Sequence, residues 1–384
     1  MKNNENLKSK FIILLILLSF IYILNENNVF ATEKEKTFFA EQADTINRMK
    51  EYMNKNSYDV NHLLSLANLY ENLFLYNEAE EVYNNALTKN PTNTEVNFRL
   101  LNIYILQGNL PEAEIVGNSM IKKNMESTGL YESMALVYLT KEDFQLALKY
   151  ANLALNINEN EENISYLNKL IELIQRNTEI DKKVTTNIEL IDFIGYDTFK
   201  SELIKNMFLS GENKRDNDHL NKYYEFLAQS ELKSNKLNEG IKYFEKVIQN
   251  EDSLPQSLDA LIISYTLNND KKQLENLLTK YPSKLSKQQK NIINILGAYL
   301  ENNDTSKLVA LNQIIENNNY QQAYFYSSLS GQLYENNNDI KKSKEMYYKF
   351  LNNTNIKEIE DQNYWYVLQP NVIKSLGKIE LKMN

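Results

Sequence analysis

The sequence predicts an all-α protein, built as an α-α superhelix of stacked helical hairpins. The chain of 384 residues contains only 9 Gly and 5 Pro, so a strand-rich fold would lack its usual turn residues. A spacing of 34 residues recurs in two sets, Tyr70, Tyr104 and Tyr138, and Ala79, Ala113 and Ala147. A fixed period of this length is typical of a solenoid made from one repeated supersecondary unit.

The first 31 residues have the features of a secretory signal peptide. Lys2, Lys8 and Lys10 precede an uncharged apolar run over residues 11–24, and Val29 and Ala31 supply small residues before a cleavage site after Ala31. The run is shorter than the ~20 residues that span a bilayer. We therefore expect an exported protein, found in the periplasm, in the cell envelope or outside the cell. The alternative is an uncleaved membrane anchor.

The first repeat unit illustrates why each element forms. Residues 60–75 place Leu63, Leu66, Ala67 and Tyr70 on one helix face, and a second stripe with Ala79, Val82, Tyr83 and Ala86 follows after a polar turn. Pro91 lacks an amide hydrogen and restricts Asn90 to an extended conformation, so the second helix is expected to end there. Thr92 or Thr94 is expected to cap the next helix.

This order of residues on a 34-residue frame resembles the tetratricopeptide repeat. The resemblance is carried by Leu66, Ala67, Tyr70, Ala79, Tyr83, Ala86 and Pro91. It implies a right-handed superhelix whose concave face is lined by the first helix of each hairpin. Two positions depart from the family pattern: Leu63 replaces the leading aromatic residue, and Ala67 replaces the glycine.

The same frame returns towards the C-terminus, where Tyr265, Tyr299 and Tyr334 each precede an Asn-Asn-Asp turn. We therefore predict six segments along the chain. They are a signal peptide (1–31), an N-terminal cap helix (32–59), three repeats (60–161), an irregular helical region (162–220) with a hinge at 211–218, four repeat-like units (221–357) and a C-terminal cap (358–384).

The composition and motifs of the sequence argue against a catalytic or metal-binding site. The chain has no Cys, which excludes disulfides and thiolate ligands, and its two histidines, His62 and His219, lie in no HExxH-type pattern. No glycine-rich phosphate loop or GxSxG nucleophile motif is present. We therefore expect no enzyme activity, no cofactor and no metal site. The net charge of −9 disfavours nucleic acid, whose phosphates require a basic face.

The resemblance implies which side chains face the groove. Apolar patches interleaved with Asn amides suit an extended peptide, because the amides can form hydrogen bonds with the peptide backbone. The predicted groove residues are Asn61, Leu64, Asn68 and Glu71 of the first unit, Glu95, Phe98, Asn102 and Ile105 of the second, with Arg99 beside them, and Glu132, Leu136 and Leu139 of the third.

Two alternatives accompany this groove. Leu64 and Leu136 could equally be ordinary packing residues, since the core and the groove of a solenoid merge. Some family members hold a peptide carboxylate in a clamp that Asn68 and Arg99 partly resemble. Leu64, Gly129 and Ser133 occupy positions where that clamp needs polar groups, so we do not predict one. Charge reversal at Arg99 together with Phe98→Ala is expected to weaken partner binding and to leave helicity intact.

An aromatic run provides a second candidate surface, because aromatic side chains often dominate binding energy. Its members are Tyr320, Tyr324, Phe325 and Tyr326.

Together these observations predict an exported, non-catalytic scaffold or adaptor that binds a protein or peptide partner. A membrane would be reached only through an uncleaved signal or a membrane-protein partner. One alternative is an accessory subunit of a cell-envelope assembly or polysaccharide-export machine. The other is a degenerate hydrolase or a glycan-binding protein that uses residues 162–220.

Overall fold

The structure is a computed structural model that describes residues 33–158, 160–177, 224–229, 231–232, 236–249, 255–316, 323–352 and 363–383. The predicted signal peptide, the 211–218 hinge, most of the 162–220 region, His219 and Tyr320 lie outside these described residues.

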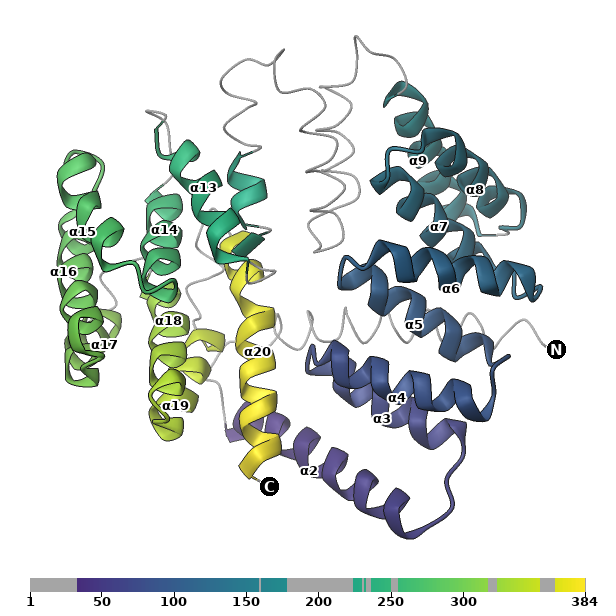
Figure 1. The fold of residues 1–384 in the computed structure, drawn as a ribbon, viewed down its shortest axis with the longest axis horizontal. Helices are drawn as coiled ribbons and strands as arrows, with labels where there is room; N and C mark the ends of the chain where they lie inside the picture. The colour runs from purple at the N-terminus through teal and green to yellow at the C-terminus, as the bar shows by residue number, and fades with distance from the viewer. Residues whose placement is uncertain are drawn as a thin grey trace.

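The described residues are helical and contain no strand, and successive helices pack in pairs (Figure 1). This confirms the predicted helical solenoid. The helices are α2 (Glu33–Lys55), α3 (Val60–Asn72), α4 (Tyr76–Lys89), α5 (Thr94–Leu106), α6 (Leu110–Lys122), α7 (Thr128–Thr140), α8 (Phe144–Asn156), α9 (Glu161–Asn177), α13 (Leu237–Val247), α14 (Pro255–Leu267), α15 (Lys271–Lys280), α16 (Lys287–Asn302), α17 (Leu308–Glu316), α18 (Ala323–Asn336), α19 (Ile340–Leu351) and α20 (Asn363–Met383), with a short 3-10 helix, η2 (Thr305–Lys307), before α17.

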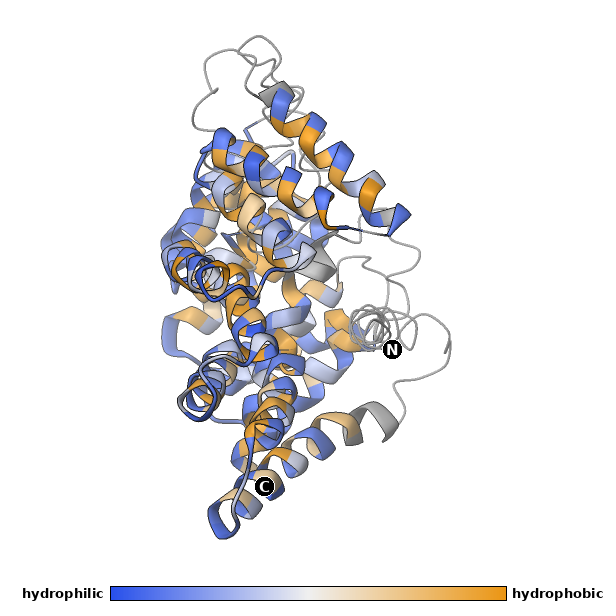
Figure 2. Ribbon diagram, turned by 90° about the vertical axis from the view of Figure 1, so that its right-hand side faces the viewer, coloured by the Kyte–Doolittle hydropathy of each residue, from blue (hydrophilic) through white to orange (hydrophobic). Residues whose placement is uncertain are grey.

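The repeated residues form the core between the helices. Most helices show one hydrophobic and one hydrophilic side (Figure 2). Ala79, Ala113 and Ala147 are fully buried, since the absence of a larger side chain lets neighbouring helices approach closely. The repeated tyrosines are buried as well, and they fill the space beside the alanines.

The turns inside five hairpins of the described ranges are closed in one recurring way. One residue adopts a left-handed conformation, and the N–H of the next residue donates to the carbonyl of the repeated tyrosine, as in a Schellman motif. The left-handed residues are Phe74, Gly108, Glu142, Asn269 and Asn338, and the backbone bonds are Leu75 to Tyr70 (2.9 Å), Asn109 to Tyr104 (2.8 Å), Asp143 to Tyr138 (2.9 Å), Asp270 to Tyr265 (2.9 Å) and Asp339 to Tyr334 (2.9 Å).

Glu142 is strained at its left-handed position. Its φ is 58°, and its side-chain Oε1 is buried with no hydrogen-bond partner in the described part of the chain. Glu142→Gly should raise the free energy of unfolding by roughly 0.5–1 kcal/mol, because glycine adopts this conformation without steric cost. Urea denaturation measures the change. Gly108→Ala, with φ at 71°, is the reciprocal control and should lower stability; an unchanged Glu142→Gly protein would contradict the assigned strain.

At the corner between the first two hairpins, helix α4 ends where the sequence predicts. Helix α4 ends at Lys89, and Asn90 has φ −143° and ψ 88°, which is extended backbone. The predicted N-cap of α5 was wrong by one residue, because the capping residue is Asn93 and not Thr92 or Thr94. The Asn93 side chain accepts a hydrogen bond from the Val96 N–H at 2.9 Å, and Thr94 is already the first helical residue.

The C-terminal helix α20 packs against α18 and α19 and also against α2, which in turn packs on α3. Figure 1 shows α2 passing beside the C-terminal end of α20. The first and last parts of the solenoid therefore meet. No helix in the described ranges is long and apolar enough to cross a membrane.

Candidate functional site

The first helices α3 and α14 differ in how much of their surface is accessible. In α14 every residue from Ser257 to Thr266 is buried, because this helix packs against α13, α15, α16 and α18. In α3 only Leu63, Leu66, Ala67 and Tyr70 are buried. An accessible first-helix face is therefore available in the N-terminal repeats, where α3 and the first half of α5 lie.

The predicted groove residues fall into three classes of exposure. Asn61 and Glu95 are exposed, whereas Ile105 and Leu139 are buried, so the latter two offer no surface to a partner in this conformation. The others are half-buried: Leu64, Asn68, Glu71, Phe98, Arg99, Asn102, Glu132 and Leu136. Among them, Leu64, Phe98 and Leu136 pack against the core, so these predicted groove residues also have a packing role.

Five polar residues from three helices form what we call the groove cluster: Asn68, Glu71, Tyr83, Glu95 and Arg99. The Tyr83 hydroxyl contacts Asn68 Oδ1 at 3.1 Å and also donates a short hydrogen bond to Glu71 Oε1. The Arg99 guanidinium lies 2.8 Å from Glu95 Oε1 through Nε and 3.7 Å from Glu71 Oε2 through Nη1. The structure thus brings together the predicted residues Asn68, Glu71 and Arg99.

Burial sets the protonation behaviour of the groove cluster. It raises the pKa of the Glu71 carboxyl above its ordinary value of 4.5; the Glu95 charge acts in the same direction, while Tyr83 and Arg99 oppose the shift. Burial and then the Glu71 charge raise the pKa of Tyr83, which keeps this hydroxyl a donor. Burial disfavours the Arg99 charge, but Glu71 and Glu95 outweigh it, and the pKa of Arg99 is raised.

The raised pKa of Glu71 has a consequence for stability. The folded protein holds the Glu71 proton more tightly than the unfolded chain does, so this group's contribution to stability falls as pH rises from 4.5 through its folded pKa. Glu71→Gln should therefore lose less stability than the wild type between about pH 4.5 and pH 7. Urea denaturation at several pH values measures the difference. Glu81→Gln, at an exposed position on α4, is the control, and parallel curves for Glu71→Gln and the wild type would refute the shift.

Tyr83 was missed as a member of the site, because the sequence pattern presents it as a packing residue of the second helix. Its ring is fully buried, yet its hydroxyl reaches the first-helix face. A related pairing joins neighbouring units, where Tyr104 bonds Glu80 at 3.1 Å and Tyr138 bonds Glu114 at 2.9 Å. Glu80 and Glu114 share the 34-residue spacing, which was the available signal for these pairs.

The second candidate surface proves to be core. Tyr324, Phe325 and Tyr326 are at most 1% exposed, so these aromatic side chains cannot contact a partner. The physical reason is that α18 packs against neighbours on several sides, namely α14, α17, α19 and α20. The Tyr326 hydroxyl is also committed, since it donates a short hydrogen bond to Asp259 on α14.

A shallow pocket lies between α2 and α3, and it is lined by Thr45, Arg48, Met49, Tyr52, Met53 and His62. The His62 ring stacks on Tyr52 with centroids 5.5 Å apart, and its Nδ1 lies 2.8 Å from Asp59 Oδ1. His62 is thus engaged on both its face and its edge. Within the described ranges, no group of three His, Asp or Glu residues could hold a metal ion.

Comparison with protein families assigns the architecture. A tetratricopeptide-repeat family model matches residues 75–131, which run from the end of the first hairpin turn through α4, α5 and α6 into α7. The matched part of the chain is thus assigned to the tetratricopeptide repeats, and the paired helices around it have the same helical-hairpin architecture. Such repeats typically form protein-interaction scaffolds and are typically non-catalytic.

Solved structures include a similar tetratricopeptide-repeat domain, that of P58(IPK). The similarity has 12% sequence identity and a TM-score of 0.30, and it covers 85% of this repeat protein and 99% of that domain. None of the curated proteins matches the chain. The family assignment therefore depends on the matched repeats and on the paired helices around them.

Proposed function

We propose that this tetratricopeptide-repeat protein is an exported, non-catalytic scaffold that binds an extended segment of a protein partner along α3, α5 and α7. The observation that carries the proposal is the accessible surface of α3 and of the first half of α5. These segments keep a half-exposed face, and Glu132, Ser133 and Leu136 extend it onto α7, whereas α14 is buried along nearly its whole length.

The chemistry of this face favours a particular kind of segment. Leu64, Phe98 and Leu136 are partly exposed and give apolar contact area. Asn102 lies four residues after Phe98 in α5, so the two side chains share one face of this helix. Glu71, Glu95 and Glu132 outnumber Arg99, and Arg99 is already paired with two of them. Charge complementarity therefore favours a partner segment that combines apolar side chains with at least one lysine or arginine.

Capture of the partner from cell-envelope extract tests the proposal. The full chain, carrying an affinity tag, should retain a specific protein. Phe98→Ala combined with Asn102→Ala should reduce the amount retained by at least about tenfold, since truncating a hot-spot side chain costs about 2 kcal/mol or more. A thermal melt of each variant checks that the fold persists.

Ile115→Ala is the matched control. Ile115 lies in the same repeat, on α6, and its side chain is 60% exposed, so the substitution removes apolar surface away from the groove. Equal capture by all three proteins would show that the α3–α5–α7 face does not bind the partner.

Export and the class of partner need separate experiments. N-terminal sequencing of the cell-associated and secreted protein should find Thr32 as the first residue if the leader is removed after Ala31. If the protein in the membrane fraction still begins with Met1, the leader is an uncleaved membrane anchor. A captured membrane channel would favour the accessory-subunit alternative, and a soluble protein would favour the scaffold.

A further inference from the structure

The two ends of this solenoid are in contact, although stacked repeats require no such contact. Helix α2 packs on α20 as well as on α3, and the Phe39 ring of α2 lies 6.2 Å from the Tyr348 ring of α19. Phe39, Ala43 and Ile46 of α2 are buried. The apolar face of the N-terminal helix is thus covered largely by the C-terminal helices.

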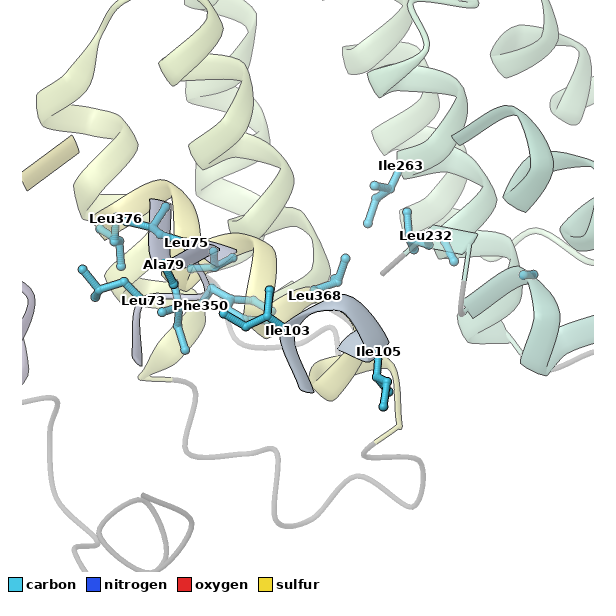
Figure 3. Close-up of a cluster of buried hydrophobic side chains, with 14 of the residues drawn as sticks. Leu73, Leu75, Ala79, Ile103, Ile105, Leu232, Ile263, Phe350, Leu368 and Leu376 are labelled. Carbon is cyan, nitrogen blue, oxygen red and sulfur yellow. The ribbon is translucent and has the colours of Figure 1, made fainter. Parts of the chain in front are cut away.

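A second contact joins α20 to the first repeat itself. A Cβ placed on Gly377 would lie 3.2 Å from Leu73 Cβ, so the α20 backbone rests directly on the α3–α4 turn. Figure 3 shows Leu73 and Leu75 of this turn beside Leu376 of α20. Lys374 of α20 lies within electrostatic reach of Glu78 at the start of α4. A Cβ at position 377 would lie closer to Leu73 than most side-chain contacts do, so the two segments approach each other tightly here.

The contact solves a physical problem of repeat proteins. Each end of a solenoid exposes an apolar face that must be capped. Here α2 and α20 cap the ends and also cover each other, so neither cap is completed without the opposite end of the chain.

The interface between α20 and its neighbouring helices also contains charged groups, which water would solvate well. Glu380 is 3% exposed and pairs with Lys344 of α19 at 2.5 Å, and Lys374 is half-buried, with a pKa lowered by burial and then by Lys378. Buried charges contribute little net stability even when paired. Pro370 inside α20 additionally removes one backbone hydrogen bond from the helix.

We propose that α20 is an intramolecular clasp: it joins the first repeat to the last in the resting protein, and it can detach from α2 and the α3–α4 turn as a unit. Detachment exposes Leu73 and the part of the apolar face of α2 that α20 covers, and it lets the two halves of the solenoid separate. The clasp does not depend on the partner proposed above.

Disulfide trapping tests the contact, because the chain has no native cysteine. Leu73→Cys with Gly377→Cys places two Cβ atoms close to the 3.5–4.5 Å range that a disulfide requires. Oxidation of the full chain should give a monomer that migrates faster on a non-reducing gel and reverts with dithiothreitol. Gly377→Cys with Ile115→Cys is the matched control, and at least about tenfold less crosslinked monomer is expected from it. Free thiols or disulfide-linked dimers from the Leu73–Gly377 pair would overturn the clasp.

Hydrogen exchange tests detachment with the same double variant. In the reduced protein, amides of α20 should exchange faster than those of α4 or α8, because they open without global unfolding. Oxidation should slow exchange in α20 by at least about tenfold and leave α8 unchanged. Equal exchange of α20 in the oxidised and reduced protein would show that this helix does not detach.

Discussion

Replacing Lys344 with methionine should lower the free energy of unfolding by about 3–5 kcal/mol. Lys344 of α19 is the cation that pairs with Glu380, at 2.5 Å between Nζ and Oε1. The Glu380 side chain is only 4% exposed. Methionine keeps the length and apolar stem of lysine but leaves the carboxylate buried without its cation, and that desolvation cost is large. Urea denaturation at neutral pH measures the loss, and α20 should be the first helix to lose protection from hydrogen exchange.

Two further variants separate the ion pair from simple packing. Lys344→Met combined with Glu380→Met removes both charges and should recover most of the lost stability, since an apolar pair often replaces a buried ion pair without penalty. Lys349→Met removes another α19 lysine whose pair with Glu316 is mostly exposed, and it should change stability little. If Lys344→Met were as stable as the wild type, Glu380 would not be held as a buried charge.

The local features of this fold were predictable because they repeat. The 34-residue spacing of tyrosine and alanine identifies the hairpins, and the recurring Asn-Asn-Asp segments identify the turns. In the structure Asn269, Asn303 and Asn338 take the left-handed conformation, and the following aspartates cap the next helices. These outcomes depend on a few neighbouring residues, and asparagine and aspartate have well-defined preferences at such positions.

The long-range features were not predictable from the same pattern. Tyr324, Phe325 and Tyr326 point in different directions from one helix, so their joint burial requires neighbours on several sides. The period describes only contacts between adjacent units and gives no sign that α14 and α18 touch. The meeting of α2 with α20 depends on the rotation accumulated over all the repeats, and small differences per repeat decide whether the ends meet.

The candidate site was predicted in part. Asn68, Glu71 and Arg99 follow from helical offsets in the first two units, and the structure places them in one cluster. The offsets could not show that Arg99 forms ion pairs with both Glu71 and Glu95, because the pair with Glu71 depends on the distance between α3 and α5. The same applies to Ile105, whose offset predicts the groove but whose side chain is buried.

Arg99→Glu should destabilise the protein by about 3 kcal/mol, since it removes the cation from a mostly buried site and adds a third carboxylate beside Glu71 and Glu95. The Arg99 side chain is 18% exposed and Glu71 is 21% exposed, so solvent screens their charges only partly. The expectation from sequence that charge reversal at Arg99 together with Phe98→Ala leaves helicity intact stays a prediction, and the circular-dichroism signal without urea tests it. Circular dichroism during urea denaturation measures the loss, and α3 and α5 should be the helices most affected.

A charge-neutral pair distinguishes repulsion from lost packing. Arg99→Met with Glu71→Gln keeps the apolar stem of Arg99 and the acceptor that Tyr83 uses, while it removes both charges. It should therefore stay close to wild-type stability, as apolar replacements of buried ion pairs often do. If it is as unstable as Arg99→Glu, the guanidinium contributes mainly through its contacts and not through its charge. If the double variant is stable but no longer captures the partner, the charges of the groove cluster are needed for partner binding and not for folding.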